Sequence, residues 1–480
     1  MKLSRVACLM SVILLAGVAV LSAQTWTPLN NQPNISASNP LLLDNGQVMV
    51  LDAGGQDWWA LTPDITGSYQ NGTWTELHLL PSGYAPTYFA SAVLPDTRVI
   101  VIGGEYNFGN AEWTNLGAIY TPKSNSWKKV YPPSGWTTVG DAQSVILADG
   151  TFMVANCCTT QEALLDAKNL TWTATGSGKY DINDEEGWTL LPSGEVLTVD
   201  ANCGSCLNSE IYNPATGSWS SAGSTVAELV DLNSHEIGPA VLRPDGTVLA
   251  TGASGHNAVY NSSTGQWSAA PDFPLNAQGQ QLDIADGPAA LLVDGNVLVM
   301  TSPGVYQTGA VFFEWNGSSF NQVPGPPNAP GDSSYYGNMV ELPTGQILFT
   351  DFSNDVELYT PSGSPNPAWA PTITKLSKTK LSPGKKYIVT GTQLNGMSQG
   401  AAYGDDVQAA SNYPLVRIIN NATGHVFYCL TDDPSSMGVA TGSLSVTADF
   451  TVPTGIETGA SQLEVVTNGI VSNAVSVTVE

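Results

Sequence analysis

Charged side chains are scarce in this sequence, and basic ones are the scarcest. Only 12% of the 480 residues are charged, with 15 Lys and Arg against 41 Asp and Glu and a net charge of −26. A surface of this sign is a poor partner for nucleic acids and for anionic membranes. We therefore expect no nucleic-acid partner, whereas this charge leaves neutral sugars, cations and a cationic partner open. Among partners we predict a carbohydrate or another small polar ligand.

Long apolar runs are also lacking, apart from one near the N-terminus. Residues 6–21 form that run, Lys2 and Arg5 precede it, and Leu21-Ser22-Ala23 suits cleavage before Gln24. With about 16 residues the run is short for a membrane span. We predict a signal peptide at 1–23, a secreted/extracellular (or periplasmic) protein and no membrane span. Removal of Lys2 and Arg5 takes the net charge from −26 to −28.

Cysteine is rare, with six residues in the chain, and one of them lies in the predicted signal. Export permits disulfides among the other five. Cys203-Gly-Ser-Cys206 is spaced to close a local loop, and Cys157-Cys158 either bridge each other or reach that pair. Zinc binding by these four is an alternative. The odd count leaves one free thiol, for which Cys429 is the candidate.

Turn residues and tryptophan are abundant, with Gly 48, Pro 31 and Trp 13, and no long helix is predicted. A unit of an apolar strand, a tight turn and a Val/Ile-rich strand recurs roughly every 50 residues, as kelch repeats do. Asp-Gly and Asn-Gly supply the positive φ that hairpin turns need. Seven such turns occur, at residues 43–46, 95–97, 148–150, 192–194, 244–246, 293–295 and 343–345.

Aromatic residues recur at the outer strands of these units. Tyr120 and Trp127 are seven residues apart, as are Tyr212 and Trp219. This kelch-type pattern predicts a seven-bladed β-propeller at residues 24–373, because a four-stranded unit must bury both of its faces against neighbours. We interpret these tryptophans as core residues between blades. After Pro371 the pattern changes to alternating strands, which predicts an immunoglobulin-like β-sandwich at 374–480.

The position seven residues before each turn should line the central channel of the propeller. These equivalent positions are Ser36, Tyr88, Asp141, Glu185, Ile237, Asp286 and Tyr336, and their neighbours include Asp184, Glu186, His235, Glu236, Asp283 and Tyr335. Three interpretations stay open for the acidic members. They act as acid and base on a substrate, they bind Ca²⁺, or they cap backbone amides in a water-filled channel.

Aromatic residues near this ring suggest a sugar-binding wall. Trp58 and Trp59 follow the first Gly-Gly strand in our prediction, and Tyr84, Tyr88 and Tyr106 lie in the second unit. Packing of that loop explains Trp58 and Trp59 equally well. If the ring binds a sugar, we predict that the substrate-binding residues are Trp58, Trp59, Tyr84, Glu236, Tyr335 and Tyr336.

Three segments resemble the galactose oxidase and glyoxal oxidase family of secreted copper-radical enzymes. The segment Ala85-Pro86-Thr87-Tyr88-Phe89-Ala90-Ser91-Ala92 is similar to the one with the radical tyrosine, which implies that role for Tyr88. Cys203-Gly-Ser-Cys206 resembles the short disulfide loop of the family. Thr423-Gly424-His425-Val426 resembles the hairpin that delivers a copper ligand into the propeller, which implies His425 as a metal ligand.

The chain departs from this family at two places. Ile35-Ser36-Ala37-Ser38-Asn39 has no cysteine to cross-link the radical tyrosine. The family's Tyr-His pair is matched either by Asp184-Glu185 or by Tyr335-Tyr336, neither of which offers the histidine. The resemblance therefore implies a divergent member with an acidic site in place of the copper-radical site.

Three functions follow from these observations. The first is binding or non-redox processing of extracellular carbohydrate by hydrolysis, elimination or epimerisation, with Asp141, Glu185 and Asp286 as acid and base and Tyr88 or His235 assisting. The second is a copper-dependent oxidase of sugar alcohols or aldehydes. The third is a non-catalytic binding or adhesion module. The cofactor is left open between none, Ca and Cu.

Overall fold

The computed structural model describes residues 24–480, so the predicted signal peptide lies outside the described residues. Turn chemistry explains how its hairpins form. Gly46 has φ +78°, and its amide donates to the carbonyl of Leu43 at the turn between the first two strands of a sheet. The same turn at Pro95-Asp96-Thr97 places a non-glycine residue, Thr97, at φ 75°. Each hairpin therefore has the left-handed residue that its tight turn requires.

Four consecutive sheets of four antiparallel strands occupy the first half of the described chain. Their strands are β2 (Ala37–Leu42), β3 (Val48–Asp52), β4 (Trp58–Thr62) and β5 (Thr73–Glu76); β7 (Ala90–Val93), β8 (Val99–Ile102), β11 (Gly117–Thr121) and β12 (Ser126–Lys129); β13 (Ser144–Ile146), β14 (Phe152–Ala155), β15 (Glu162–Asp166) and β16 (Thr171–Thr175); and β17 (Thr189–Leu190), β18 (Val196–Val199), β19 (Asn208–Asn213) and β20 (Ser218–Ser224).

Three further sheets continue the pattern. They are β21 (Ala240–Leu242), β22 (Thr247–Ala250), β23 (Asn257–Asn261) and β24 (Gln266–Ala270); β25 (Ala289–Leu291), β26 (Val297–Thr301), β27 (Val311–Trp315) and β28 (Phe320–Val323); and β29 (Asn338–Glu341), β30 (Ile347–Thr350), β31 (Glu357–Thr360) and β1 (Thr25–Pro28). The short strands β6 (Pro86–Thr87), β9 (Tyr106–Asn107) and β10 (Asn110–Ala111) form a small sheet beside them, and the 3₁₀ helices are η1 (Pro122–Ser124), η2 (Ala329–Gly331), η3 (Ser334–Tyr336) and η4 (Pro367–Trp369).

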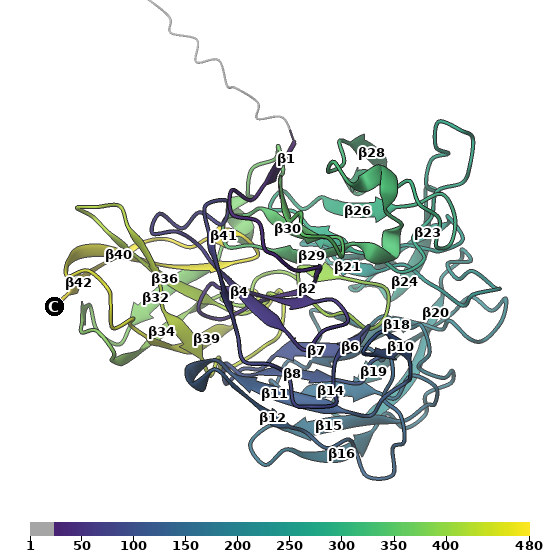
Figure 1. The fold of residues 1–480 in the computed structure, drawn as a ribbon, viewed down its shortest axis with the longest axis horizontal. Coiled ribbons are helices and arrows are strands. Elements are labelled where there is room, and N and C mark those ends of the chain that lie inside the picture. Colours follow the sequence, from purple (N-terminus) through teal and green to yellow (C-terminus); the bar gives the residue numbers. More distant parts are fainter. Residues whose placement is uncertain (1–23) are drawn as a thin grey trace, which may run out of the picture.

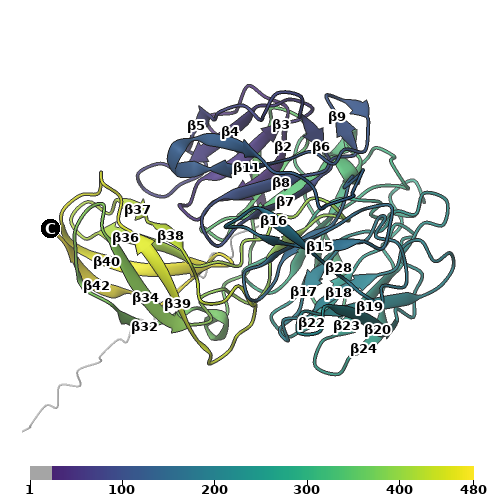
Figure 2. The same ribbon diagram turned by 90° about the horizontal axis from the view of Figure 1, so that it is seen from below.

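The seven sheets close into a ring around an axis (Figures 1 and 2). The innermost strands of neighbouring sheets contact each other at six places, β2–β7, β7–β13, β17–β21, β21–β25, β25–β29 and β29–β2, and the last of these joins the final sheet to the first. The N-terminal strand β1 pairs antiparallel with β31, so the last sheet combines both ends of the ring. The prediction of an all-β propeller fold is confirmed. The kelch assignment and the limits of 24–373 stay predictions.

Tryptophan side chains pack and form hydrogen bonds between neighbouring sheets. Trp219 of β20 donates its indole N–H to Glu162 of β15, and Trp267 of β24 donates to Ser209 of β19. Trp58 and Trp315 are fully buried. These contacts agree with the interpretation of the outer-strand tryptophans as core residues.

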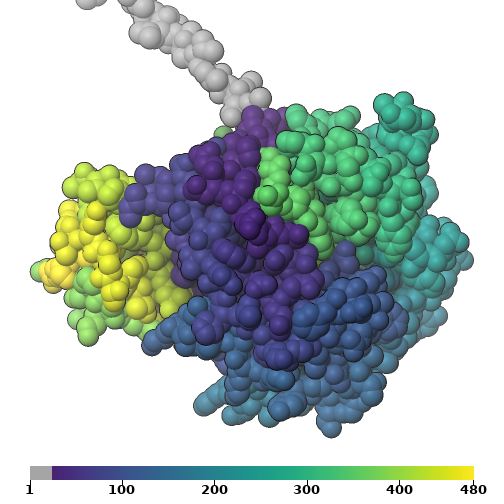
Figure 3. Space-filling view, viewed as in Figure 1, coloured from purple at the N-terminus to yellow at the C-terminus, as the bar shows by residue number. Residues whose placement is uncertain are grey.

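The residues from Thr372 onward form a two-sheet unit. This unit lies at one side of the propeller (Figure 3). A separate apolar core, with Val389, Val416 and Phe450 among its members, lies between its sheets. One sheet is β32 (Thr372–Leu376), β34 (Lys386–Thr392), β39 (Ser445–Thr451) and β38 (Leu430–Asp432). The other is β33 (Lys380–Leu381), β42 (Val475–Val479), β40 (Gly459–Thr467), β36 (Leu415–Asn420), β37 (Val426–Tyr428) and β41 (Ile470–Val471). Its immunoglobulin-like class and the boundary at 374 stay predictions.

One segment of this C-terminal unit enters the ring. Residues 393–414 connect β34 to β36, and within them β35 (Ala401–Ala402) pairs with β25 as a fifth strand of the sixth sheet. We call residues 393–414 the insert. Most of the insert is buried, because the inner ends of the propeller strands surround it. The two parts of the chain are therefore joined at the propeller axis.

Candidate functional site

A cavity of about 690 Å³ lies on the propeller axis. All seven sheets contribute to it through loops at one end of their inner strands, and the insert contributes two residues. The lining consists of Ala53, Gly54, Thr87, Tyr88, Glu105, Tyr106, Gly109, Asp141, Glu185, Ser234, Glu236, Asp286, Tyr306, Tyr335, Phe352, Asp405 and Asp406. Seven of these are carboxylates, and none is Lys, Arg, His or Cys. Oxygen atoms and aromatic rings are thus the chemical groups that the cavity offers.

Strained backbone aims several of these side chains into the cavity. Tyr88, Glu185 and Asp286 have φ of 52°, 60° and 51°, and each lies a few residues before the innermost strand of its sheet. Left-handed φ costs about 1–3 kcal/mol in a non-glycine residue and tends to occur at functional sites. The three lie at positions that the repeat predicted to be equivalent. The fold therefore repeats one strained loop conformation around the axis.

The carboxylates form two groups that share Glu185. One oxygen from each of Asp141, Glu185 and Asp405 lies within 4.8 Å of the other two, and the same is true of Glu185, Glu236 and Asp286. We call these groups the first and the second acidic triad. Asp405 belongs to the insert, so the first triad joins the propeller to the C-terminal unit.

Burial and mutual repulsion shift the pKa values of these groups upward. Burial raises the pKa of Asp141, of Asp286 and of Asp405 well above the usual range, and neighbouring carboxylates add to the rise. Burial, followed by the charge of Glu236, raises the pKa of Glu105 to about 7. In the absence of a counter-charge, these carboxyl groups therefore favour the protonated form.

Tyrosines pack around the triads. Tyr88 stacks on Tyr403 of the insert with ring centroids 6.4 Å apart, and Tyr403 donates its hydroxyl to the backbone carbonyl of Tyr335. Tyr306 donates its hydroxyl to Glu236 Oε1. Because the side chain of Tyr306 is 48% exposed, it marks the mouth of the cavity.

Gly404 allows the insert to approach the propeller. A Cβ at this position would lie 2.1 Å from Asp286 Oδ1, and a Cβ at Gly187 would lie 2.4 Å from the carbonyl oxygen of Gly404. Both glycines are therefore needed for close approach rather than for an unusual φ. Their packing fixes Asp405 and Asp406 beside the carboxylates of the propeller loops.

Six of the residues selected from the sequence line the cavity together. They are Tyr88, Asp141, Glu185, Glu236, Asp286 and Tyr335. Tyr336 packs on Tyr335 with centroids 4.3 Å apart and on Phe352, just behind the wall. His235 lies between two lining residues but is not one of them. The roles of all these residues stay predictions.

The aromatic wall is different from the expected one. Trp58 is in strand β4 rather than in a loop, and the strand alternation buries it completely against Phe89 and Trp127. Trp59 is half-buried and packs on the hydrophobic core. Tyr84 is buried too, and its hydroxyl donates to the carbonyl of Gly103. None of the three lines the cavity.

His425 also lies away from the cavity. Its Nδ1 contacts Glu457 Oε1 at 2.7 Å, and the amide of the next residue, Val426, donates to Ile65 between β4 and β5. The cavity-lining Gly54 lies before the opposite end of β4, so this hairpin packs at the far end of the sheet. The insert, not the hairpin with His425, is the C-terminal segment that reaches the axis, and it brings carboxylates.

Four residues of this site were not predicted from the sequence: Glu105, Tyr403, Asp405 and Asp406. Asp405 and Asp406 lie in a stretch of the C-terminal unit without strand-like alternation, between β34 and β36. That interruption was a usable signal, because an acidic pair inside an otherwise alternating sandwich needs a separate explanation. Glu105 follows Gly103-Gly104 in the loop after β8.

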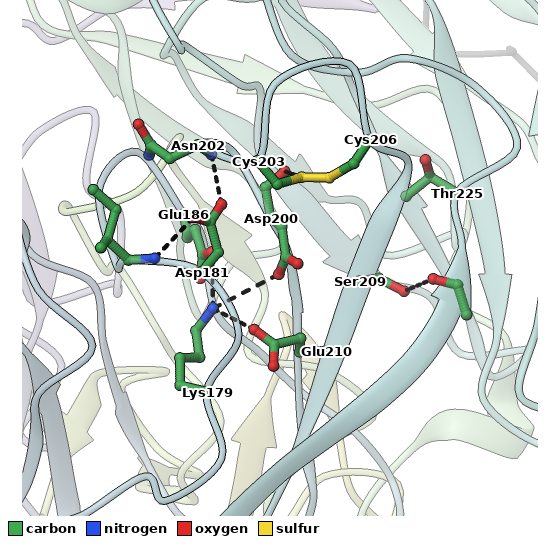
Figure 4. Close-up of a disulfide and its surroundings, with 12 residues drawn as sticks. Lys179, Asp181, Glu186, Asp200, Asn202, Cys203, Cys206, Ser209, Glu210 and Thr225 are labelled. Atoms are coloured by element: carbon green, nitrogen blue, oxygen red, sulfur yellow. Dashed lines mark hydrogen bonds and ion pairs between the residues drawn. A yellow bond between two sulfur atoms is a disulfide. The ribbon is translucent and has the colours of Figure 1, made fainter.

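The cysteines pair locally. The chain has disulfides between Cys157 and Cys158 and between Cys203 and Cys206, and Cys429 is free and buried. The second disulfide closes a loop beside Asp200, next to the buried Lys179 (Figure 4). These four cysteines are therefore paired with each other and form no cysteine zinc site.

Copper, which the family resemblance implied, does not fit the cavity. Copper(II) favours nitrogen ligands in proteins, as in the two imidazoles that the resemblance implied. The lining has neither histidine nor cysteine, and His425 is bonded elsewhere. The donor set suits hard cations instead.

Comparisons with known proteins support the fold. No protein-family model and no curated protein matches the chain. Among solved structures, a fungal alcohol oxidase of the AA5 family in complex with copper matches with a TM-score of 0.53 and 14% identity, over 95% of this chain and 100% of that one. A streptogramin B lyase matches at 10% identity and a TM-score of 0.48, over 70% and 97% of the two chains.

An extracellular domain of a hybrid two-component system from B. thetaiotaomicron matches with a TM-score of 0.48 and 10% identity, over 96% of this chain and 59% of that one. At 14% identity, the first match shows the fold alone. No helix in residues 24–480 is long and apolar enough to cross a membrane.

Proposed function

We propose that this protein binds an extracellular carbohydrate in the axial cavity and transforms it by a non-redox reaction. The observation that carries the proposal is the cavity itself, which brings seven carboxylates and five tyrosine or phenylalanine rings together in about 690 Å³. Pockets of this size suit a small ligand of one or a few rings. A sugar offers many hydroxyl donors, and carboxylates are acceptors for them.

Aromatic side chains at the mouth support the same ligand class. Tyr306 is 48% and Phe108 is 47% exposed, and Phe108 lies beside the lining residues Tyr106 and Gly109. Exposed rings of this kind can pack against the apolar faces of sugar rings. Their position beside the acidic centre suits a ligand that extends out of the cavity.

Paired carboxylates supply the chemistry that hydrolysis, elimination and epimerisation need, because each of these reactions transfers protons. Asp286 and Glu236 of the second acidic triad both line the cavity, with carboxylate oxygens within 4.8 Å of each other. The hydroxyl of Tyr306 donates a hydrogen bond to Glu236. The sequence indicated Asp141, Glu185 and Asp286 for the acid and base roles. We assign these roles to Asp286 and its neighbour Glu236, because these two carboxylates belong to the second acidic triad alone. Tyr88 lies beside Asp286 and assists them.

The test is a binding and turnover screen on neutral, amino and acidic oligosaccharides, followed by the variant D286N. We expect at least one class to bind saturably and to be converted, and we expect about a hundredfold lower turnover in D286N, because acid–base groups contribute roughly 10²–10⁴-fold. Full activity in D286N would contradict the proposed carboxylate mechanism. Binding without turnover would instead identify a binding module.

Copper loading gives a separate control. Because the cavity lacks nitrogen ligands, we expect no oxygen-dependent release of peroxide on sugar alcohols or aldehydes after incubation with copper. Peroxide release that depends on Tyr88 would contradict the proposal and favour the oxidase.

A further inference from the structure

We propose that the first acidic triad, Asp141, Glu185 and Asp405, binds a hard divalent cation, with Ca²⁺ as the best match, and that this ion joins the insert to the propeller. The proposal goes beyond the carbohydrate function and does not depend on it. It begins from an imbalance of charge: seven carboxylates line the cavity, and no basic side chain lines it.

A second buried acidic group in the same chain shows how such a charge is compensated elsewhere. Glu186, Asp200 and Glu210 have oxygens within 4.8 Å of one another. Lys179 is buried between them, with its Nζ at 2.9 Å from Glu186, 3.7 Å from Asp200 and 2.6 Å from Glu210 (Figure 4). Burial alone would lower the pKa of Lys179, but these three carboxylates raise it above its usual range.

The axial cavity has no equivalent of Lys179. Several of its buried oxygens lack any hydrogen-bond partner among the described residues, including Asp141 Oδ1, Asp405 Oδ2 and both oxygens of Asp406. Asp406 is outside the triads, is only 1% exposed and lines the cavity beside Asp405. A buried carboxylate without a partner is costly, so these side chains point to a positive ligand from outside the chain.

The geometry favours a metal ion over an organic cation. Three carboxylate oxygens within 4.8 Å of one another can share one ion, whereas Asp405 at 2% exposure and Asp406 at 1% are too enclosed for the amine of a sugar polymer. The donors are all oxygen, which excludes a preference for zinc or copper. Ca²⁺ takes six to eight oxygen ligands in flexible arrangements, whereas Mg²⁺ keeps most of its water.

The position of the ligands predicts a structural consequence. Asp141 precedes β13, Glu185 precedes β17 and Asp405 belongs to the insert. One ion bound to all three would link two sheets of the propeller to the C-terminal unit. Ligands that bind only the native state raise its stability, so the melting temperature should depend on Ca²⁺.

The experiment uses the full secreted chain, stripped with EDTA and dialysed, and titrated with CaCl₂ and MgCl₂ at pH 7.5 by calorimetry and thermal melting. We expect saturable Ca²⁺ binding, weaker Mg²⁺ binding and a melting temperature higher by at least about 4 °C, a shift of the size that modest stabilisation gives. The variant D405N should weaken Ca²⁺ binding by at least about tenfold, because it removes a charged ligand.

The matched control is D449N. Asp449 belongs to another group of three carboxylates, Asp432, Asp433 and Asp449, but this group lies at the surface, and Lys386 contacts Asp432 and Asp449. We expect D449N to bind Ca²⁺ as the unchanged chain does. If D405N does not fold, as judged by circular dichroism, D141N removes a ligand from a different loop and takes its place.

Absence of saturable Ca²⁺ uptake by the unchanged chain would overturn the proposal, as would equal uptake by the unchanged chain, D405N and D141N. Binding of glucosamine oligomers without any uptake of metal would overturn it too, because an amine would then supply the missing charge. Failure of the carbohydrate screen leaves the metal titration unaffected, so the two proposals fail separately.

Discussion

The burial of Lys179 is costly unless its three acidic partners are in place. Its ammonium group is enclosed by Glu186, Asp200 and Glu210, and it lies 5.4 Å from the ring centroid of Trp219. A lysine with no exposed side-chain surface is rare unless it is paired. The disulfide between Cys203 and Cys206 closes the neighbouring loop, so this part of the fourth sheet is held by covalent and ionic contacts together.

We expect K179M to destabilise the protein by about 3–5 kcal/mol, because the change leaves buried carboxylates without their counter-charge. Chemical denaturation monitored by tryptophan fluorescence measures the effect. K380M is the control, since the ion pair of Lys380 with Glu480 is exposed and contributes at most about 1 kcal/mol. Equal midpoints for the two variants would contradict the structural role of Lys179.

Gly404 is a second residue at which one added carbon atom would disturb the packing, because a Cβ there would lie 2.1 Å from Asp286 Oδ1. We expect G404A to lower the stability by about 1–3 kcal/mol and to weaken binding at the cavity, because the added methyl group would overlap Asp286. Thermal melting and Ca²⁺ titration report the two effects. G331A is the control, since a Cβ at Gly331 meets no atom within 4 Å. A melting temperature equal to that of G331A would show that the insert moves away freely.

The elements that matter most are the ones that join distant parts of the chain. Strand β1 completes the last sheet, and Trp26 in its centre packs on Phe312, Phe349 and Tyr359, with ring centroids 5.0–5.5 Å apart. The insert performs the same task at the axis, where β35 extends the sixth sheet. Both elements pair with strands that are far away in the sequence, and local sequence patterns do not reveal such contacts.

Truncation of Trp26 should therefore weaken the closure of the ring. We expect W26A to cost about 3 kcal/mol, at the lower end of the range for removal of a large aromatic side chain, because Trp26 is only partly buried. Denaturant unfolding measures the cost. W113A tests the same substitution at a side chain that is 50% exposed, where we expect a change within about 0.5 kcal/mol. A smaller cost in W26A than in W113A would show that β1 does not stabilise the ring.

At the scale of the whole molecule, buried acids outnumber buried bases, so stability should depend on pH. Glu341 is an example away from the cavity, at the contact between β29 and the C-terminal unit. Burial raises its pKa to about 8, although Asn468 and Ser411 donate hydrogen bonds to it. The unfolded chain releases this proton near pH 4.5, whereas the native state keeps it to about pH 8.

The native state therefore binds more protons than the unfolded state between these two values, and the free energy of unfolding falls as the pH rises through this window. Each such group contributes a slope of up to about 1.4 kcal/mol per pH unit. We expect E341Q to reduce the slope between pH 5.5 and 7.5, measured by denaturation in EDTA. E76Q, at an exposed position in β5, should leave the slope unchanged. An unchanged slope in E341Q would show that Glu341 is already ionised in the native state.

The sequence alone determined the local structure of this protein. Its Asp-Gly and Asn-Gly turns, the repeat near 50 residues and the spaced tryptophans predicted the hairpins and the propeller fold, because hairpins are specified by neighbouring residues. The same repeat selected Tyr88, Glu185 and Asp286 as equivalent positions, and the structure places all three at the axial cavity with the same left-handed backbone.

Only the tertiary structure decided which other residues meet them. Trp58 was expected in a loop, but strand alternation buries it between sheets, and His425 was expected at the axis, but its hairpin packs at the opposite end of β4. Asp405 and Asp406 reach the centre from more than a hundred residues away in sequence, because the insert threads into the ring. A contact of that separation depends on the packing of two folded parts, and no local pattern of residues contains it.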